Sequence, residues 1–240
     1  MKKNTTRWDL AQNYEYHWWK SKENKVKPNY YQHGAEEIRN YYNQQSKITS
    51  STAILEVGSG ALGVVTFLAE SQERYAIDPL EHYYSSVPEF IASRDKNVKY
   101  FNCKGENLPF DSHFFDLIIM DNVLDHCENP EQVMSEMIRV AKKSGFVFFR
   151  QNTYTLYGKL FRKLMELFLI DKGHPYTFTK QDITKLFEKH KLKVLSKKRN
   201  GYFYTWKAEI LSKSLKDKVK ALLFVTRDRA TYFLSIPVEN

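Results

Sequence analysis

Two acidic side chains lie on either side of a glycine-rich turn, each at the end of a short apolar run. Glu56 belongs to the run Ala53–Val57, and the turn Gly58–Gly63 follows it with glycines in the spacing GxGxxG. Asp78 ends the next apolar run, 20 residues after Gly58. This spacing is typical of turns that hold a dinucleotide pyrophosphate while the acid binds a ribose. Alone it favours a nicotinamide or flavin enzyme, and the signal is weak.

Glu56 argues against a dinucleotide. It stands two residues before Gly58, at the carboxyl end of the expected strand, where dinucleotide-binding strands usually carry an apolar residue. A carboxylate there repels a pyrophosphate and attracts a ligand that carries an ammonium and a sulfonium group. S-adenosylmethionine has both cations and no phosphate. Electrostatics therefore favour the methyl donor as cofactor, with S-adenosylhomocysteine as its product.

Further motifs follow one another along the chain. They are Leu55–Gly60, Ala76–Pro79, Gly105–Phe110, Phe114–Ile119 and Asn122–His126, with Glu128–Pro130 directly after. In this order they resemble the motifs of the class I S-adenosylmethionine-dependent methyltransferases, and in particular the branch that acts on small molecules and sugars. The resemblance covers roughly residues 50–150. Several ordered motifs are much more specific than one glycine turn.

The resemblance implies a set of cofactor-binding residues. They are Glu56, Gly58, Ser59, Gly60, Asp78, Pro79, Gly105, Glu106, Asp121 and Asn122. Within this set, the Asp78 carboxylate is expected to accept hydrogen bonds from the ribose hydroxyls.

Two positions depart from the family pattern. Leu62 stands where the third glycine usually falls, and Gly63 comes one residue late, so a wider turn into the first helix is expected. Lys104 replaces an aspartate that many relatives carry. The backbone near Gly105 and Glu106 is then expected to hold the adenine amino group.

The candidate catalytic residues lie at the end of the motif Asn122–His126 and farther along the chain. Methyl transfer from an activated sulfonium needs chiefly an acceptor placed in line with it, and a base helps when the acceptor is a hydroxyl or a protonated amine. Asp125 and His126 follow the fourth expected strand, and His174 follows a helix beyond the fifth. Histidine, with an ordinary pKa of about 6.5, suits this task. Cys103, Cys127 and the seven histidines show no metal-ligand spacing, so we predict no metal.

Short apolar runs alternate with helical patterns along the chain. Strands are expected at residues 53–57, 74–77, 97–102, 115–120, 146–150, 193–196 and 231–236, and helices at 64–70, 131–141, 156–170, 179–190 and 215–224. This alternation predicts an α/β fold with a Rossmann-like, doubly wound and mostly parallel seven-stranded sheet. Its carboxyl edge would bring Gly58, Asp78 and Asp121 together.

Two helical segments are expected to accompany the sheet. Residues 1–45 are predicted to form a helical N-terminal cap, broken near Lys27-Pro28 and lying across the ligand edge. Residues 46–240 are predicted to form the methyltransferase domain, with a lid insertion at about 152–180. The cap offers candidate side chains for the acceptor pocket, namely His17, Tyr14, Tyr16, Tyr30 and Tyr31.

The net charge of +9 is concentrated in the last 90 residues. Residues 1–150 carry 18 basic and 20 acidic side chains, whereas residues 151–240 carry 19 and 8. A basic flank can bind an anionic metabolite, an anionic lipid surface or nucleic acid. The clusters at 197–199 and 213–220 lack the interleaved aromatics of a single-strand nucleic-acid platform, so nucleic acid is not the expected partner.

Compartment and membrane contact follow from the apolar segments. The chain starts without the apolar region of a signal peptide, and the stretch Leu164–Ile170 is too short to cross a bilayer, so a cytoplasmic protein is expected. The segment Leu156–Ile170 mixes basic and large apolar residues. It fits a lid over the substrate pocket better than a membrane-surface helix, although peripheral membrane contact stays open.

These residues together predict an enzyme that transfers a methyl group from S-adenosylmethionine to oxygen or nitrogen of a small-molecule acceptor. A sugar or an anionic, phosphate-bearing precursor is the expected acceptor. One alternative is an RNA-directed methyltransferase that uses the basic C-terminal third. Another is a non-catalytic scaffold that keeps the fold.

Overall fold

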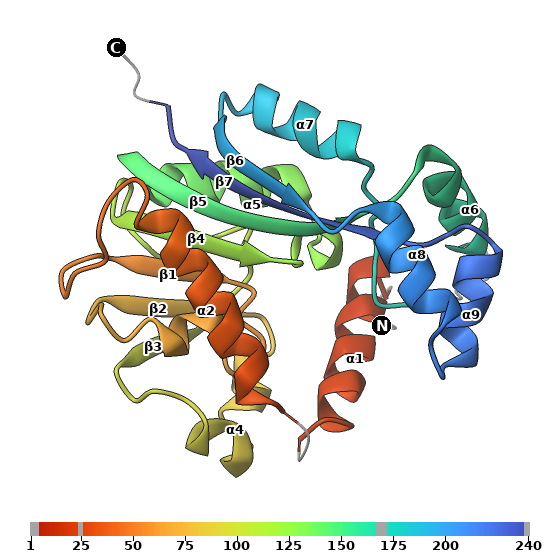
Figure 1. The fold of residues 1–240 in the computed structure, drawn as a ribbon. Helices are drawn as coiled ribbons and strands as arrows, with labels where there is room; N and C mark the ends of the chain where they lie inside the picture. Colours follow the sequence, from red (N-terminus) through yellow and green to blue (C-terminus); the bar gives the residue numbers. More distant parts are fainter. Residues whose placement is uncertain (1–4, 24–25, 167–171, 238–240) are drawn as a thin grey trace.

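A single seven-stranded sheet runs through the computed structural model, which describes residues 5–23, 26–166 and 172–237 (Figure 1). The strands are β1 (Ile54–Val57), β2 (Arg74–Asp78), β3 (Val98–Asn102), β4 (Phe115–Asp121), β5 (Ala141–Thr153), β6 (Lys193–Arg199) and β7 (Asp228–Ser235). Their order is β3-β2-β1-β4-β5-β7-β6, and β7 alone runs antiparallel to its neighbours. The predicted doubly wound, mostly parallel sheet is confirmed.

Helices cover both faces of the sheet and gather at one end of it (Figure 1). They are α1 (Arg7–Lys20), α2 (Pro28–Tyr42), α3 (Glu81–Tyr84), α4 (Pro88–Ala92), α5 (Pro130–Val140), α6 (Leu156–Glu166), α7 (Lys180–Lys189), α8 (Tyr202–Ile210) and α9 (Leu215–Leu222). The expected helix at 156–170 is present as far as Glu166, and residues 167–170 lie outside the described part of the chain.

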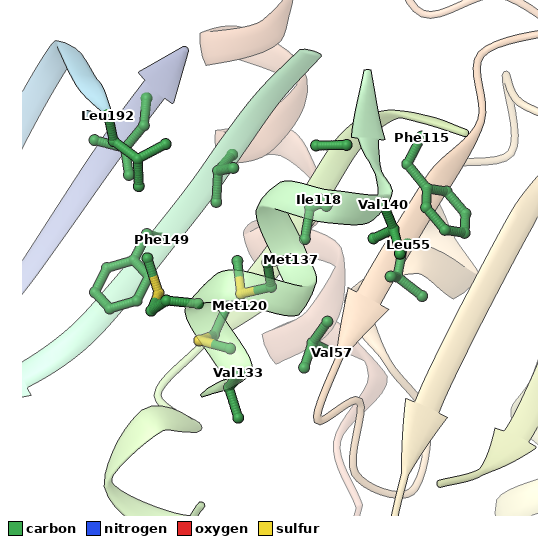
Figure 2. Packing of buried hydrophobic residues seen from close by; sticks show 14 of the residues in the cluster. Leu55, Val57, Phe115, Ile118, Met120, Val133, Met137, Val140, Phe149 and Leu192 are labelled. Carbon is green, nitrogen blue, oxygen red and sulfur yellow. The ribbon is translucent and has the colours of Figure 1, made fainter. Parts of the chain in front are cut away.

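One core fills the space between α5 and the sheet. Val133, Met137 and Val140 recur along one side of α5 and pack onto Leu55 and Ile118 (Figure 2). Side chains alternate across a strand, so the residues beside Leu55 point to the opposite face. Each of these helix and strand residues is essentially inaccessible to water, and the central strands therefore hold a rigid edge for the site.

The opposite face is covered by α2, the helix that directly precedes β1 in the sequence. Ala35, Ile38 and Tyr42 share a core with Val64 and Val65. The predicted break near Lys27-Pro28 is present, because Pro28 is the first residue of α2, where a missing N–H costs nothing. An N-terminal helix thus takes the place between β1 and β2 where a crossover helix would normally pack.

The prediction of a helix over residues 64–70 is wrong. The chain makes only one 3-10 turn there, η1 (Val64–Phe67). Val64, Val65 and Thr66 are β-branched and lose side-chain freedom in a helix. In addition, the Thr66 hydroxyl donates to the Leu62 carbonyl, and α2 already covers this face. The crossover is therefore short and tight, and it lies directly behind the glycine turn.

Two helical segments interrupt the second half of the sheet. The first follows β5 and includes α6. The second, α8 and α9, lies between β6 and β7, and the sequence analysis predicted only its second helix. The expected helix at 179–190 is confirmed as α7, whose first turn is capped by Thr179 and Asp182.

A substitution in α2 can test whether this helix is part of the core. Replacing Ile38 with Ala removes a fully buried side chain between α2 and η1, and we expect the free energy of unfolding to fall by about 2–5 kcal/mol. Ile91→Ala, at a half-exposed position of α4, is the matched control and should change it by less than about 0.5 kcal/mol. Urea denaturation measures both; equal losses would show that α2 is not part of the core.

Candidate active site

A cavity of about 1150 Å³ lies beyond the carboxyl ends of β1, β2 and β4. The strands are in parallel register, with Val57 beside both Ile77 and Met120, so their last residues and the following turns meet at one edge. All ten predicted cofactor residues line this cavity, namely Glu56, Gly58, Ser59, Gly60, Asp78, Pro79, Gly105, Glu106, Asp121 and Asn122. The structure therefore brings together the set that the motifs implied.

The glycine turn depends on the absence of side chains. Gly58 and Gly60 have φ angles of 72° and 59°, which favour glycine. A Cβ at Gly58 would lie 2.4 Å from a methyl of Val123, and one at Gly60 would lie 2.7 Å from the Trp19 ring. The turn is thus held between the loop after β4 and helix α1, which leaves its backbone facing the cavity.

The late glycine of the motif has its own role. Gly63 has a φ of 77°, while Leu62, at the usual place of the third glycine, is fully buried. A Cβ at Gly63 would lie 2.9 Å from a carboxylate oxygen of Glu56. Gly63 therefore lets the chain pass close to Glu56 before η1 begins.

Glu56 is a buried acid whose hydrogen-bond donors among the described residues are backbone N–H groups. Its side chain is 3% exposed, and its Oε2 accepts a hydrogen bond of 2.8 Å from the Val65 N–H. Burial raises the pKa of Glu56 to about 8, and nearby Asp121 and Asp78 also raise it. A positive charge in the cavity would favour the ionised form of Glu56.

Asp78 closes β2 and faces the same cavity. Its Oδ2 accepts from the Gly60 N–H at 3.0 Å and its Oδ1 from the Leu80 N–H at 2.9 Å. Burial raises the pKa of Asp78 to about 6. A carboxylate offers about four acceptor positions, so two remain for donors on a ligand.

Asp121 belongs to a buried ion-pair network that the sequence analysis missed. Arg150 on β5 donates to Asp121 Oδ2 at 2.8 Å and also pairs with Glu37 of α2. The other oxygen of Asp121 is buried without a hydrogen-bond partner among the described residues, as is Oε1 of Gln12. Both residues line the cavity, so each supplies an acceptor for a donor group on a ligand. Only a three-dimensional view connects Glu37, Asp121 and Arg150, since more than 80 residues separate the first two.

The residues expected near adenine have mixed roles. Glu106 Oε1 accepts from the backbone N–H groups of Glu128 and Asn129, so this side chain holds the start of α5. Lys104 pairs with Glu128 and lies over the Trp8 ring of α1 at 3.6 Å from its centre. The backbone at Gly105 lines the cavity, in keeping with the expected adenine contact.

The three candidate catalytic residues lie together. The rings of His126 and His174 are 4.5 Å apart between centres. His126 Nδ1 lies 3.5 Å from Glu15 Oε1 of α1, and its Nε2 lies 3.8 Å from Asp125 Oδ1. Both histidines line the cavity, whereas Asp125 is buried behind His126.

This cluster was invisible in the sequence, because 48 residues separate the two histidines. Ligand atoms of Asp125, His126 and His174 all lie within 4.8 Å of one another, a donor set that can bind a divalent cation. The spacing along the chain did not show this set of possible ligands, and the expectation that the protein binds no metal stays a prediction.

The remaining walls come from the two ends of the chain. Tyr14, Tyr30 and Tyr31 line the cavity as expected, but Tyr16 and His17 are not among its lining residues. Basic side chains from the C-terminal third also line the cavity, several of them on α6 and α9, and they were not assigned from the sequence. They are Arg162, Lys172, Lys216, Lys220, Arg227 and Arg229. Their only signal in the sequence was the excess of basic residues after residue 150.

The comparisons with known proteins agree with this geometry. Residues 55–149 match a family model described as a methyltransferase domain. An uncharacterised protein of Methanocaldococcus jannaschii is 38% identical over 50 residues, which are 21% of this chain and 24% of that protein. The match thus spans about a quarter of the curated relative's length.

Two solved structures share the fold. Geranyl diphosphate C-methyltransferase from Streptomyces coelicolor is 9% identical, with a TM-score of 0.63 over 84% of this chain and 79% of that chain. Phosphoethanolamine N-methyltransferase 2 of Haemonchus contortus is 14% identical, with a TM-score of 0.60 over 81% of this chain and 51% of that chain. The family match identifies residues 55–149 as a methyltransferase domain. The fold is the one that these S-adenosylmethionine-dependent enzymes share, so the resemblance to the class I methyltransferases is confirmed, whereas the small-molecule and sugar branch stays a prediction.

The buried carboxyl groups predict how stability depends on pH. Glu56 and Asp78 have folded pKa values of about 8 and 6, above their ordinary values of 4.5 and 3.8. The folded protein thus holds protons that the unfolded chain has released, so these two groups lower stability as the pH rises from about 4 to 8.

Glu56→Gln keeps an acceptor for the Val65 N–H and removes the titrating group. Between pH 5 and 8 we expect its free energy of unfolding to fall less steeply than that of the original protein, by about 1.4 kcal/mol per pH unit. Glu89→Gln, at an exposed site, should leave the slope unchanged. Urea denaturation at several pH values gives the slopes, and parallel slopes for Glu56→Gln and the original protein would contradict the raised pKa.

Proposed function

We propose that this protein transfers a methyl group from S-adenosylmethionine to oxygen or nitrogen of a small, anionic acceptor. The observation that carries the proposal is that one cavity is lined both by carboxylates at the strand edge and by several basic side chains of the C-terminal third. The carboxylates are those of Glu56, Asp78 and Asp121. A cationic cofactor suits the carboxylates, and an anionic acceptor suits the basic side chains.

The described residues fit the cofactor group by group. Asp121 Oδ1 and Gln12 Oε1 are buried acceptors without partners in the described chain, and an ammonium group supplies the donors that they lack. Asp78 has acceptor positions for ribose hydroxyls, and the backbone at Gly105 offers the edge for adenine. Two of the neighbours in fold are complexes with S-adenosylhomocysteine, and a second structure of the Haemonchus contortus enzyme contains S-adenosyl-L-methionine.

The acceptor class rests on the basic side chains of this cavity. Arg162, Lys216 and Arg229 bring guanidinium and ammonium groups to the cavity. Such groups bind phosphate or carboxylate oxygens well, and arginine can do so with two parallel hydrogen bonds. The Haemonchus contortus enzyme is in complex with phosphomonomethylethanolamine and the Streptomyces coelicolor enzyme with geranyl diphosphate, both phosphate-bearing. A phosphate-bearing metabolite or sugar is therefore the acceptor that we propose.

The bound cofactor supplies a methyl group that is already activated on its sulfonium. The chain must then orient the acceptor and take up its proton. We assign this proton to Nε2 of His126, because Nδ1 is buried beside Glu15. The carboxylates of Glu15 and Asp125 flank the ring at 3.5 and 3.8 Å and orient it. Asp125 acts as a positioning residue, and His174 borders the place of the acceptor.

The ribose contact can be tested with two variants of Asp78. Asp78→Ala should weaken S-adenosylhomocysteine binding at least about tenfold, since hydrogen bonds to a charged group contribute about 1.5–3 kcal/mol each. Asp78→Asn, which keeps one acceptor oxygen, should weaken it less. Asp111→Ala, at an exposed aspartate, is the matched control and should bind as the original protein does. Isothermal titration calorimetry measures all four proteins. Unchanged affinity in Asp78→Ala would refute the assignment.

The role of His126 can be separated from cofactor binding. With an acceptor identified by screening phosphorylated small molecules, His126→Gln should lower kcat by about 10²–10⁴-fold and leave S-adenosylhomocysteine affinity unchanged. His33→Gln, whose side chain is 80% exposed, should keep full activity. If His126→Gln instead loses cofactor affinity and keeps kcat, this histidine is not the base.

The same assay decides between proton transfer and a metal at this cluster. We expect a chelator to leave the rate unchanged, because the proposed step needs only the imidazole. Loss of activity that one divalent cation restores would assign Asp125, His126 and His174 as metal ligands instead.

A further inference from the structure

Helices α6, α8 and α9 expose an unusual number of large apolar side chains. On α6, Leu156, Leu160 and Leu164 are 69%, 56% and 62% exposed. On α9, Leu215 and Leu222 are 76% and 66% exposed. Single exposed leucines need no explanation, but a contiguous apolar patch marks a surface that binds something.

The exposed side chains form stripes rather than a scatter. Leu156, Leu160 and Leu164 are four residues apart, and Leu215 and Leu222 are seven apart, so each set lies on one side of its helix. Phe203 on α8 adds a side chain that is 79% exposed. The stripes face away from the core, because only Gly158 of α6 and Ala221 of α9 are buried within these helices.

The three helices lie together at one end of the sheet (Figure 1). Trp206 of α8 donates its indole N–H to the Ala221 carbonyl of α9 at 2.9 Å. Residues of α6 and α9, among them Arg162 and Lys216, line the same cavity. The stripes therefore belong to one surface of the molecule.

Basic side chains surround this surface. The segments 156–166 and 202–222 contain eight basic and three acidic residues. Lys163, Lys207, Lys213 and Lys218 are exposed, and none of them pairs with an acidic side chain in the part of the chain that the structure describes. Apolar stripes with flanking lysines match the boundary between acyl chains and anionic headgroups.

We propose that α6, α8 and α9 form a docking face for an anionic lipid bilayer. The charge of the lysines complements phosphatidylglycerol-type headgroups, and the leucine stripes can enter the acyl boundary. RNA fits this face less well, since aliphatic stripes offer no stacking surface to bases. None of the described helices has the length and apolar content to cross a bilayer, and docking at the surface requires neither.

The docking face borders the cavity. Leu215, Val219 and Leu223 are at least 39% exposed and also line the cavity wall. On a docked protein this side of the cavity faces the headgroups. The following inference rests on the proposed function. An acceptor carried at the bilayer surface reaches the site without leaving the membrane.

Vesicle flotation with the full-length protein tests the docking face. We expect the protein to float with phosphatidylcholine vesicles that contain phosphatidylglycerol, to stay behind with pure phosphatidylcholine, and to be released by salt. Leu160→Asp with Leu164→Asp should reduce the floated fraction by at least about tenfold. Ile91→Asp, an equally exposed apolar residue on α4, should float as the original protein does.

A second double variant, Lys207→Glu with Lys218→Glu, should also lose flotation, and thermal unfolding checks that each variant is folded. No flotation with anionic vesicles, or equal flotation of the leucine variant, would overturn the docking face. So would a concentration-dependent dimer that the leucine variant abolishes, or RNA binding that it abolishes without any vesicle binding. Titration of the original protein with S-adenosylhomocysteine distinguishes failure of the docking face from failure of the proposed function. Absence of that binding contradicts the proposed function, whereas the flotation result does not depend on it.

Discussion

Buried negative charge at the carboxyl edge of the sheet is the constraint around which the site is built. Glu56 and Asp78 accept hydrogen bonds from backbone N–H groups there, and Asp121 has a cationic side chain, Arg150, beside it. Removing a carboxylate from water is costly unless it is paired or protonated. The raised pKa values of Glu56 and Asp78 show that this cost is not fully met within the chain. A cation bound in the cavity would offset this cost by pairing with the buried carboxylates. The same charges that burden the fold at this edge therefore favour the proposed cationic cofactor.

The N-terminal helices complete this edge in two different ways. Helix α2 packs behind η1, where β-branched residues do not continue a helix, and its Glu37 reaches Arg150. Helix α1 stands at the cavity, where Trp19 lies against Gly60 and Glu15 approaches His126. The segment predicted as a cap thus has one helix in the core and one at the site. Substitutions in these first residues should affect folding and ligand binding separately.

Much of the fold could be predicted because strands and strand ends are local signals. All seven expected strands are present, and the glycine turn and Asp78 stand where their spacing placed them. Helix α8 was missed because its aromatic residues do not follow a clear apolar period. Residues 64–70 were assigned a helix because a segment between two parallel strands usually contains a crossover helix. The contacts between distant residues could not be predicted from the sequence. Arg150 pairs with Glu37, and His126 lies beside His174, only because the topology of the sheet brings them together. The charge excess after residue 150 was visible early, but not that part of it would line the cavity.

The central claim is that the carboxylate edge holds a cationic nucleoside cofactor. The most direct measurement is a calorimetric titration of the purified protein with S-adenosylmethionine, S-adenosylhomocysteine and NADH. The account predicts that the first two ligands bind with one-to-one stoichiometry and that NADH, which carries a pyrophosphate toward Glu56, does not bind. Binding of NADH alone would contradict the reading of Glu56. If none of the three binds, the cavity serves another ligand and the fold is kept for a different purpose.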